Sequence, residues 1–329
     1  MNPPVIQLLM NVRPDCMRRD KGLTLVELMV SIALGMFIVM VTTALFLSTK
    51  SGYSRQDAEA HMQEAGRFAV DLVARSVRAA SFRDWASKDA ALLSGPSVYG
   101  LDARSLKGRM PAIEMPIARS VNGSDVLAIR FSGAGSGESG DGTVLNCAGF
   151  GVPAGRVGED AGTSRGWSIF YVAEDSTGEP ELYCKYRGDD AWTSQAVARG
   201  VESFQVLYGL DADDDGLPDQ FLSATAMNAL DNSPGIPGAI PTAGNSNTVW
   251  NKVVAVKFAL LIRGANKTSD GGGVVQYELF GKDYADAYAE VDPGVRIGEA
   301  SLPSSARGRQ RKIFSATILL PATPLRGAT

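Results

Sequence analysis

The chain has 329 residues, of which 45% are hydrophobic and 21% charged, and its formal net charge is −4. This composition is typical of a globular protein and excludes a disordered or fibrous one. An acidic chain lacks the basic face that nucleic-acid binding requires, so we expect no nucleic-acid partner. Because His61 is the single histidine, zinc sites with two imidazoles are excluded and His61 is the one candidate base for a Ser-His-Asp triad. We therefore expect no enzyme activity.

The first predicted element is a strongly apolar helix. Twenty residues from Leu28 to Leu47 carry no charge, and at 1.5 Å per residue they span about 30 Å, the thickness of a bilayer core. Basic residues lie on both sides of this run, with a slight excess before it, which favours a cytoplasmic N-terminus. A secretory signal peptide fits poorly, because its small-residue cleavage site should follow the apolar core.

One carboxylate, Glu27, stands next to this apolar run, where insertion of a carboxylate costs about 2.5–3.5 kcal/mol. It therefore needs a partner. The stretch KGLTLVELMVSIALG, residues 21–35, resembles the class III leader and N-terminal helix of type IV pilins and pseudopilins. The resemblance implies that a prepilin peptidase cuts after Gly22 and methylates the new terminus at Leu23, where Phe is usual. It also implies that Glu27 pairs with the terminal amine of a neighbouring subunit. The alternative is a plain membrane anchor with an incidental glutamate.

The helix is predicted to continue past the apolar run. From Ala58 to Ala80, apolar residues recur at steps of three and four, and charged residues occupy the other faces. We expect a leader over residues 1–22, a helix over 23–81 and a β-rich periplasmic or extracellular domain over 82–329. Within the helix, residues 23–47 would lie in the membrane or the filament core, and the second half would pack on the β domain. A leader of usual length would begin at Met17.

Beyond residue 82, short apolar runs alternate with Gly, Pro, Asp and Ser, which is typical of antiparallel strands. Hairpin-like turns are predicted at EDSTGEP, residues 174–180, and at KTSDGGG, residues 267–273, with loops over 132–143 and 231–247. The fold class is therefore α+β, a long N-terminal helix packed on an antiparallel sheet domain. The predicted strands are 126–131, 167–173, 182–186, 201–210, 253–262, 274–280 and 313–320.

Three C-terminal segments indicate which type of pilin the chain resembles. VESFQVLYGLDADDDGLPDQF from Val201, WNKVVAVKFALLIRG from Trp250 and RKIFSATILLPA from Arg311 resemble the PilW type of minor pilin, although Pro321 and Ala322 stand where that family has Arg-Asn. The resemblance implies a type IV pilin-like fold and a minor pilin that primes pilus assembly in the tip complex and supports twitching motility and adhesion.

The same resemblance implies a location and a set of partners. The chain would be a single-pass inner-membrane protein with its N-terminus in the cytoplasm, and after assembly it would lie at the pilus tip. Its partners would be other minor pilins, the major pilin, the prepilin peptidase, the inner-membrane assembly platform and a tip adhesin. Two alternatives stay open: a J-type pseudopilin of a type II secretion system and a membrane-anchored periplasmic enzyme. A β domain that acts as a binding module at the tip is compatible with the minor-pilin role.

Two cysteines, Cys147 and Cys184, would lie outside the inner membrane, where the oxidising environment favours a disulfide. Loop-closure entropy makes such a bridge worth about 4 kcal/mol. The alternative is two buried thiols. The third cysteine, Cys16, would be removed with the leader.

The acidic stretch DADDDGLPDQFL, residues 211–222, matches most of a calcium loop, with Gly216 at the turn position. Position twelve of the calcium-loop pattern is not matched, because Leu222 there offers no carboxylate. The alternative interpretation is an acidic Asx-type turn. A second acidic group, Asp283, Asp286 and Glu290, is interpreted as a solvated helix face. The candidate calcium ligands are Asp211, Asp213, Asp215, the Leu217 carbonyl and Asp219.

Overall fold

The computed structural model describes residues 22, 24–80, 96–154, 166–188, 191–231, 248–267 and 275–321. The chain divides into two units, residues 1–54 and 55–329. The predicted leader up to residue 21, Leu23, the loop over 232–247 and most of the KTSDGGG turn lie outside the described residues.

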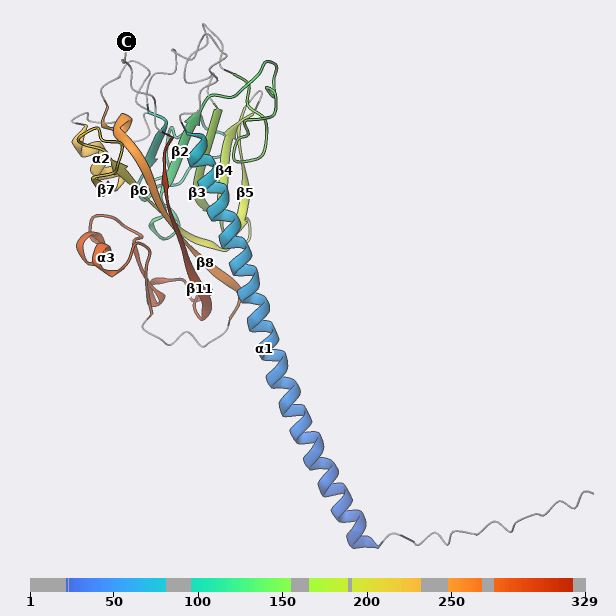
Figure 1. The fold of residues 1–329 in the computed structure, drawn as a ribbon. Coiled ribbons are helices and arrows are strands. Elements are labelled where there is room, and N and C mark those ends of the chain that lie inside the picture. Colours follow the sequence, from blue (N-terminus) through green and yellow to red (C-terminus); the bar gives the residue numbers. More distant parts are fainter. Residues whose placement is uncertain are drawn as a thin grey trace, which may run out of the picture. The chain divides into compact units, whose positions relative to one another are not determined.

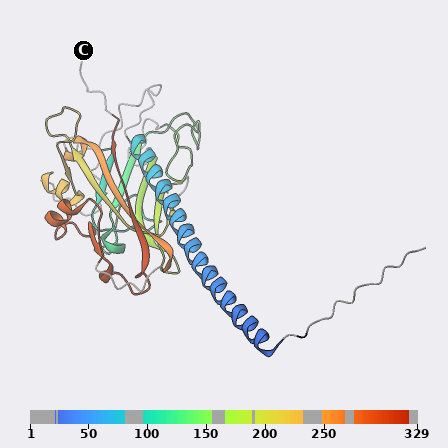
Figure 2. The same ribbon diagram turned by 60° about the horizontal axis from the view of Figure 1, so that its bottom comes forward.

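The long helix α1 runs from Leu25 to Ala79 without a break (Figure 1). In the first unit, Leu25–Lys50 is long and apolar enough to cross a membrane, and none of it is buried. In the second unit the helix presents the predicted apolar stripe to the core, where Met62, Ala69, Val73 and Val77 are buried. Figure 2 shows its last turns lying beside the strands of the β domain.

The β domain contains two main antiparallel sheets and a small one. The five-stranded sheet has the order β1-β2-β3-β4-β5, and the four-stranded sheet has the order β11-β8-β6-β7. β9 and β10 form a separate pair. These strands and the long α1 confirm the α+β fold class. The strand bounds are Val98–Leu101, Val126–Phe131, Gly166–Glu174, Pro180–Arg187, Trp192–Arg199, Val201–Leu210, Gln220–Leu222, Val253–Lys267, Gln276–Glu278, Arg296–Gly298 and Arg309–Leu319 for β1 to β11.

The central strands are mostly apolar because both of their faces are covered. Every residue of β2 and β6 is buried, and β8 is buried over most of its length. β6 packs against β2, β3 and β4 of the other sheet, so the two sheets and the second half of α1 share one hydrophobic core. Continuous apolar runs are typical of strands covered on both sides.

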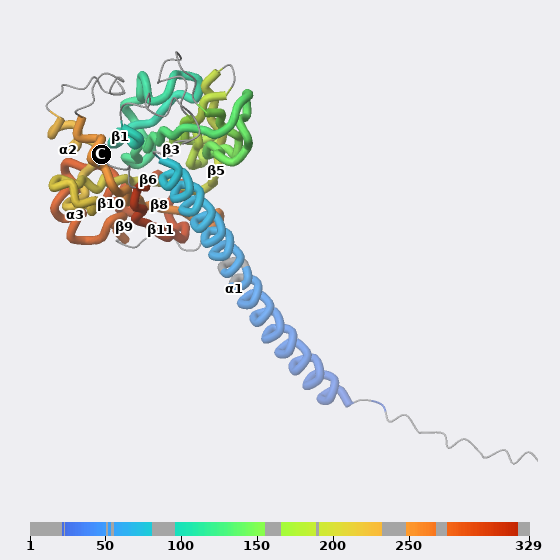
Figure 3. Tube along the Cα trace, turned by 45° about the horizontal axis from the view of Figure 1, so that its top comes forward, coloured from blue at the N-terminus to red at the C-terminus, as the bar shows by residue number. Residues whose placement is uncertain are grey.

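Two short helices lie at the edge of this domain. Figures 1 and 3 both place α2, Ala224–Leu230, and α3, Lys282–Tyr288, on the flank opposite β5. Ser223 caps α2 by accepting a hydrogen bond from the backbone N–H of Ala226. Of the acidic residues interpreted as a helix face, Asp283 and Asp286 lie on α3, and Glu290 follows its end.

The predicted strands 126–131 and 201–210 match β2 and β6 at both ends, and the EDSTGEP turn joins β3 to β4. The predicted strand 274–280 corresponds to β9, which is only three residues long. The hairpin predicted between this strand and β8 is wrong, because β9 pairs with β10 whereas β8 pairs with β6 and β11. The sequence patterns also missed β1, β5, β7 and β10, which are short or, like β5, mostly exposed.

A buried ion network ties the four-stranded sheet together. Glu202 on β6 accepts hydrogen bonds from Arg263 on β8 and from Arg311 on β11, each at 3.1 Å. Arg311 also donates to Glu299 at 2.8 Å. The Arg311 and Glu202 side chains are 0% and 1% exposed. Since buried charges persist only when paired and hydrogen-bonded, this network connects three adjacent strands to the η4 turn, Glu299–Ser301.

Candidate functional site

The start of α1 is held by a local pair of residues. The Thr24 hydroxyl accepts the backbone N–H of Glu27 at 3.3 Å and donates to the Glu27 carboxylate at 3.5 Å. Thr24 therefore caps the helix, in a T-x-x-E pattern close to a capping box. The carboxylate also lies in the first turn, where the helix dipole favours negative charge. Sequence reasoning missed this role of Glu27, although the T-x-x-E spacing signals it.

The predicted charge pairing of Glu27 involves the amine of Leu23, which lies outside the described residues. Gly22, the other residue of the predicted cleavage site, precedes the helix and is exposed. Both roles stay predictions.

The apolar side chains of α1 from Leu25 to Leu47 are exposed in the first unit. Leu25, Phe37 and Phe46, for example, are exposed by 73%, 63% and 68%. An apolar surface of this extent requires a lipid or protein environment rather than water. This is the property expected of a helix that anchors in a membrane and then packs with other helices.

Cys147 and Cys184 form the predicted disulfide. Cys147 and Cys184 are bonded, with their Cα atoms 5.9 Å apart, and both are buried. Cys184 lies on β4, whereas Cys147 lies in the segment between β2 and β3. The backbone N–H of Cys147 also donates to the Ser168 hydroxyl at 2.9 Å. The bridge thereby fixes this segment to the five-stranded sheet.

The acidic loop lies between β6 and β7. Asp211, Asp213 and Asp215 each bring one carboxylate oxygen within 4.8 Å of the others. The two oxygens of Asp211 accept the backbone N–H groups of Asp215 at 3.2 Å and Gly216 at 2.8 Å. Gly216 has a φ of +85°, a value that favours glycine.

The remaining predicted ligands of this loop stand apart from the trio. Asp219 accepts the backbone N–H of Ala212 at 2.7 Å and is not part of the cluster of Asp211, Asp213 and Asp215. Lys252 pairs with Asp214 at 3.1 Å. The arrangement can hold a hard cation through oxygen ligands, and it also satisfies the description of an Asx-type turn.

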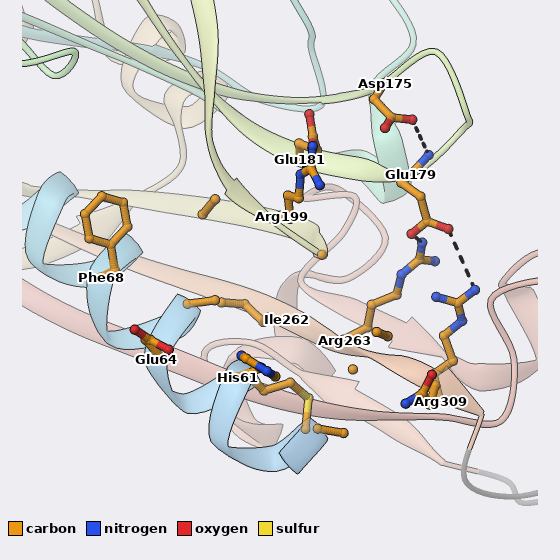
Figure 4. Close-up of a pocket in the computed structure, with 18 of the residues that line it drawn as sticks. His61, Glu64, Phe68, Asp175, Glu179, Glu181, Arg199, Ile262, Arg263 and Arg309 are labelled. Atoms are coloured by element: carbon orange, nitrogen blue, oxygen red, sulfur yellow. Dashed lines mark hydrogen bonds and ion pairs between the residues drawn. The ribbon is translucent and has the colours of Figure 1, made fainter. Parts of the chain in front are cut away.

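A pocket of about 870 Å³ lies between the second half of α1 and the ends of β4, β5 and β8 (Figure 4). On one side α1 contributes His61, Glu64 and Phe68, and on the other Arg263 and Arg309 both pair with Glu179. The charges on that side are largely neutralised by one another.

The chemistry available around His61 is limited. Its side chain is 74% exposed, and its ion-pair partner in the described part of the chain is Asp57 on the preceding turn, at 3.7 Å. No hydroxyl or thiol nucleophile is paired with it among the described residues. That the chain has no enzyme activity stays a prediction.

Comparison with known proteins agrees with the local features above. The prokaryotic N-terminal methylation motif matches residues 17–43, which contain Gly22, Leu23 and Glu27. The family described as type IV pilus-assembly protein W matches residues 169–322, which run from β3 past the end of β11. The two matches support a pilin of the PilW type.

No curated protein matches this pilin. Among solved structures, a match is the type IV-like pilin TTHA1219 from Thermus thermophilus, with 14% sequence identity and a TM-score of 0.32. The match covers 79% of this chain and 96% of that one. At this TM-score the likeness carries no argument, so the α+β assignment of the pilin rests on its own helix and sheets.

Proposed function

We propose that this pilin is a minor pilin that primes assembly of a type IV pilus and takes its place in the tip complex, where it supports twitching motility and adhesion. The observation that carries the proposal is the N-terminal methylation motif, residues 17–43, which overlaps the exposed apolar helix segment Leu25–Lys50. A filament of helices would bury that surface, which a soluble protein could not leave in water. The match of the C-terminal half to a pilus-assembly family supports the same role.

In this proposal the chain is first an inner-membrane protein with a cytoplasmic N-terminus. The prepilin peptidase cuts after Gly22, and Leu23 becomes the methylated first residue. Glu27 then pairs with the terminal amine of an adjoining subunit, which relieves the cost of a carboxylate in apolar surroundings. The helix packs among those of the major pilin and the other minor pilins, delivered by the assembly platform, while the β domain meets neighbouring tip subunits and the tip adhesin.

The capping geometry suggests how to test the charge pairing separately from the helix start. Glu27→Gln keeps a hydrogen-bonding side chain for Thr24 but removes the negative charge. We expect normal cleavage after Gly22 but little incorporation into sheared pili. Glu27→Asp keeps the charge and serves as the matched control, with incorporation closer to wild type.

Piliation, twitching and the composition of sheared pili are the measurements. Wild-type incorporation of the Glu27→Gln protein would contradict the pairing. A mature chain that begins at a residue other than Leu23 would contradict the filament role altogether. If deletion of the gene abolished secretion of exoproteins and left piliation unchanged, the alternative of a type II secretion pseudopilin would replace the pilus.

We also propose that the loop of residues 211–219 binds Ca²⁺, with Asp211, Asp213 and Asp215 as its carboxylate ligands, the Leu217 carbonyl at position seven and Asp219 at position nine. The convergence of the three carboxylates and the left-handed turn at Gly216 support this. Titration of Ca²⁺ into the full chain in detergent should give binding heat that Asp215→Asn reduces. Equal heats for wild type and this variant would contradict the loop site.

A further inference from the structure

A second group of carboxylates meets inside the β domain. Asp102 follows β1, Asp125 directly precedes β2, and Asp292 follows α3. Each offers one carboxylate oxygen, and these atoms lie within 4.8 Å of one another. Asp125 and Asp292 are both 2% exposed, and Asp102 is partly buried. Three acidic groups are thus gathered from positions up to 190 residues apart in a largely water-free place, unlike the loop over 211–219, where Asp213 and Asp215 are exposed.

Neutral donors hold these carboxylates in position without compensating their charge. Within the described part of the chain, no ion pair with Lys, Arg or His involves Asp102, Asp125 or Asp292. A carboxylate in such surroundings is strongly unfavourable unless a cation or a proton compensates it. The donors are the backbone N–H groups of Ala103 and Val206 to Asp125, those of Ala224 and Thr225 to Asp102, and the Tyr284 hydroxyl to Asp292.

Two buried polar atoms at this cluster lack a partner among the described residues. One is the Oδ1 atom of Asp292, whose Oδ2 already accepts the Tyr284 hydroxyl at 2.9 Å. The other is the hydroxyl of Tyr208 on β6, whose side chain is fully buried. Burial, followed by the negative charges of Asp102 and Asp125, raises the pKa of Tyr208 well above its ordinary value, so this phenol lies in the field of the same carboxylates. Buried polar atoms normally have a hydrogen-bond or ion partner, so these two are available to bind one.

We propose that Asp102, Asp125 and Asp292 form a buried site for a divalent cation of the calcium class, separate from the loop over 211–219. Carboxylate and phenol oxygens are hard ligands, which suit calcium and disfavour metals that prefer thiolate or imidazole. The ion would compensate the three negative charges and bind the unpartnered oxygen of Asp292. It would also connect the β1–β2 pair, the start of α2 and the segment after α3, so that one ion stabilises the packing of three parts of the domain.

The test uses the full chain in detergent micelles, stripped with EDTA and then supplied with CaCl₂, and follows thermal unfolding. All variants carry Asp215→Asn, which disables the loop site. In this background we expect Ca²⁺ at a hundredfold excess over its Kd to raise the unfolding midpoint by about 5 °C. Adding Asp292→Asn should abolish the shift. Asp283→Asn, an exposed carboxylate on the neighbouring α3, is the matched control and should preserve it.

The outcomes separate binding from folding. Since Asp292→Asn removes one of three mutually repelling charges, the variant should unfold at the same temperature as its parent in EDTA, or higher. Should Asp292→Asn fail to fold, Asp102→Asn repeats the test at the more exposed edge of the cluster. A calcium shift that survives both substitutions, or the absence of any shift in the Asp215→Asn parent, would overturn the proposal. In the second case the carboxylates are compensated by protons.

Discussion

Replacement of Arg311 by methionine should be among the most damaging single changes in the β domain. The Arg311 side chain is 0% exposed and donates to Glu202, 1% exposed, and to Glu299, 6% exposed. Methionine has a similar length but supplies no donor, so it leaves two buried carboxylates short of a cation. Breaking a buried pair by removing one partner costs about 3–5 kcal/mol.

The structure favours the lower end of that range. Glu202 keeps its hydrogen bond to Arg263, and Glu299 keeps the backbone N–H of Gly308 at 2.7 Å. We therefore expect a loss of about 3 kcal/mol, which for a domain of this size lowers the unfolding midpoint by about 6–12 °C. The assay is thermal unfolding of the full chain in detergent, followed by tryptophan fluorescence.

A matched control lies on the exposed face of α1. Arg75 pairs with Asp71 at 3.0 Å, but both side chains are 61% exposed, so Arg75→Met should cost less than about 0.5 kcal/mol. Addition of Glu299→Gln to Arg311→Met should recover part of the loss, since Glu299 is the carboxylate that loses its cation while Glu202 keeps Arg263. If Arg311→Met shifted the midpoint no more than Arg75→Met, the reasoning about buried charge would be refuted.

Three further predictions concern the disulfide, a buried acid and a helix glycine. Cys184→Ala should lower the free energy of unfolding by about 2–5 kcal/mol, and dithiothreitol should lower that of the wild type by a similar amount. An unfolding free energy of the wild type that does not respond to dithiothreitol would exclude a structural role for the bridge. Burial, followed by the charge of Asp102, raises the pKa of Asp292 to about 7, so between pH 4 and 7 the folded chain binds more protons than the unfolded one. In EDTA the contribution of Asp292 to stability is therefore present below pH 4 and lost as pH rises towards 7. Asp292→Asn should be more stabilising, relative to wild type, at pH 7 than at pH 4, and an equal effect at both pH values would contradict the raised pKa of Asp292. A Cβ at Gly66 would lie 2.4 Å from the Phe314 ring of β11, so Gly66→Ala should destabilise by about 1–3 kcal/mol despite the better helix propensity of alanine. Gly52→Ala, where a Cβ meets nothing within 4 Å, should be neutral or stabilising by up to about 1 kcal/mol, and identical effects at the two glycines would disprove the packing argument.

Much of the proposed function could be predicted from short stretches of the sequence. The apolar run from Leu28 to Leu47 and the motif around Gly22 and Glu27 depend only on residues that are neighbours in the chain, and the N-terminal methylation motif, residues 17–43, covers Gly22, Glu27 and most of that run. β2 and β6 were predictable for a related reason. Each is a mostly apolar run bounded by turn residues, and its burial on both faces makes that pattern visible without knowledge of its neighbours. The disulfide was predictable because two cysteines lie in the part of the chain that was expected to be outside the inner membrane, where oxidising conditions favour a bond.

Tertiary structure decided what depends on residues far apart in the chain. β9 pairs with β10 rather than with β8, and the largely exposed β5 forms the edge of the five-stranded sheet. Both outcomes depend on which strand edges the rest of the fold leaves open for pairing. The buried pairing of Glu202 with Arg311 and the meeting of Asp102, Asp125 and Asp292 have no spacing by which a sequence could reveal them. Helix, membrane and processing signals act over a few residues, whereas burial of a charge is a property of everything that packs around it.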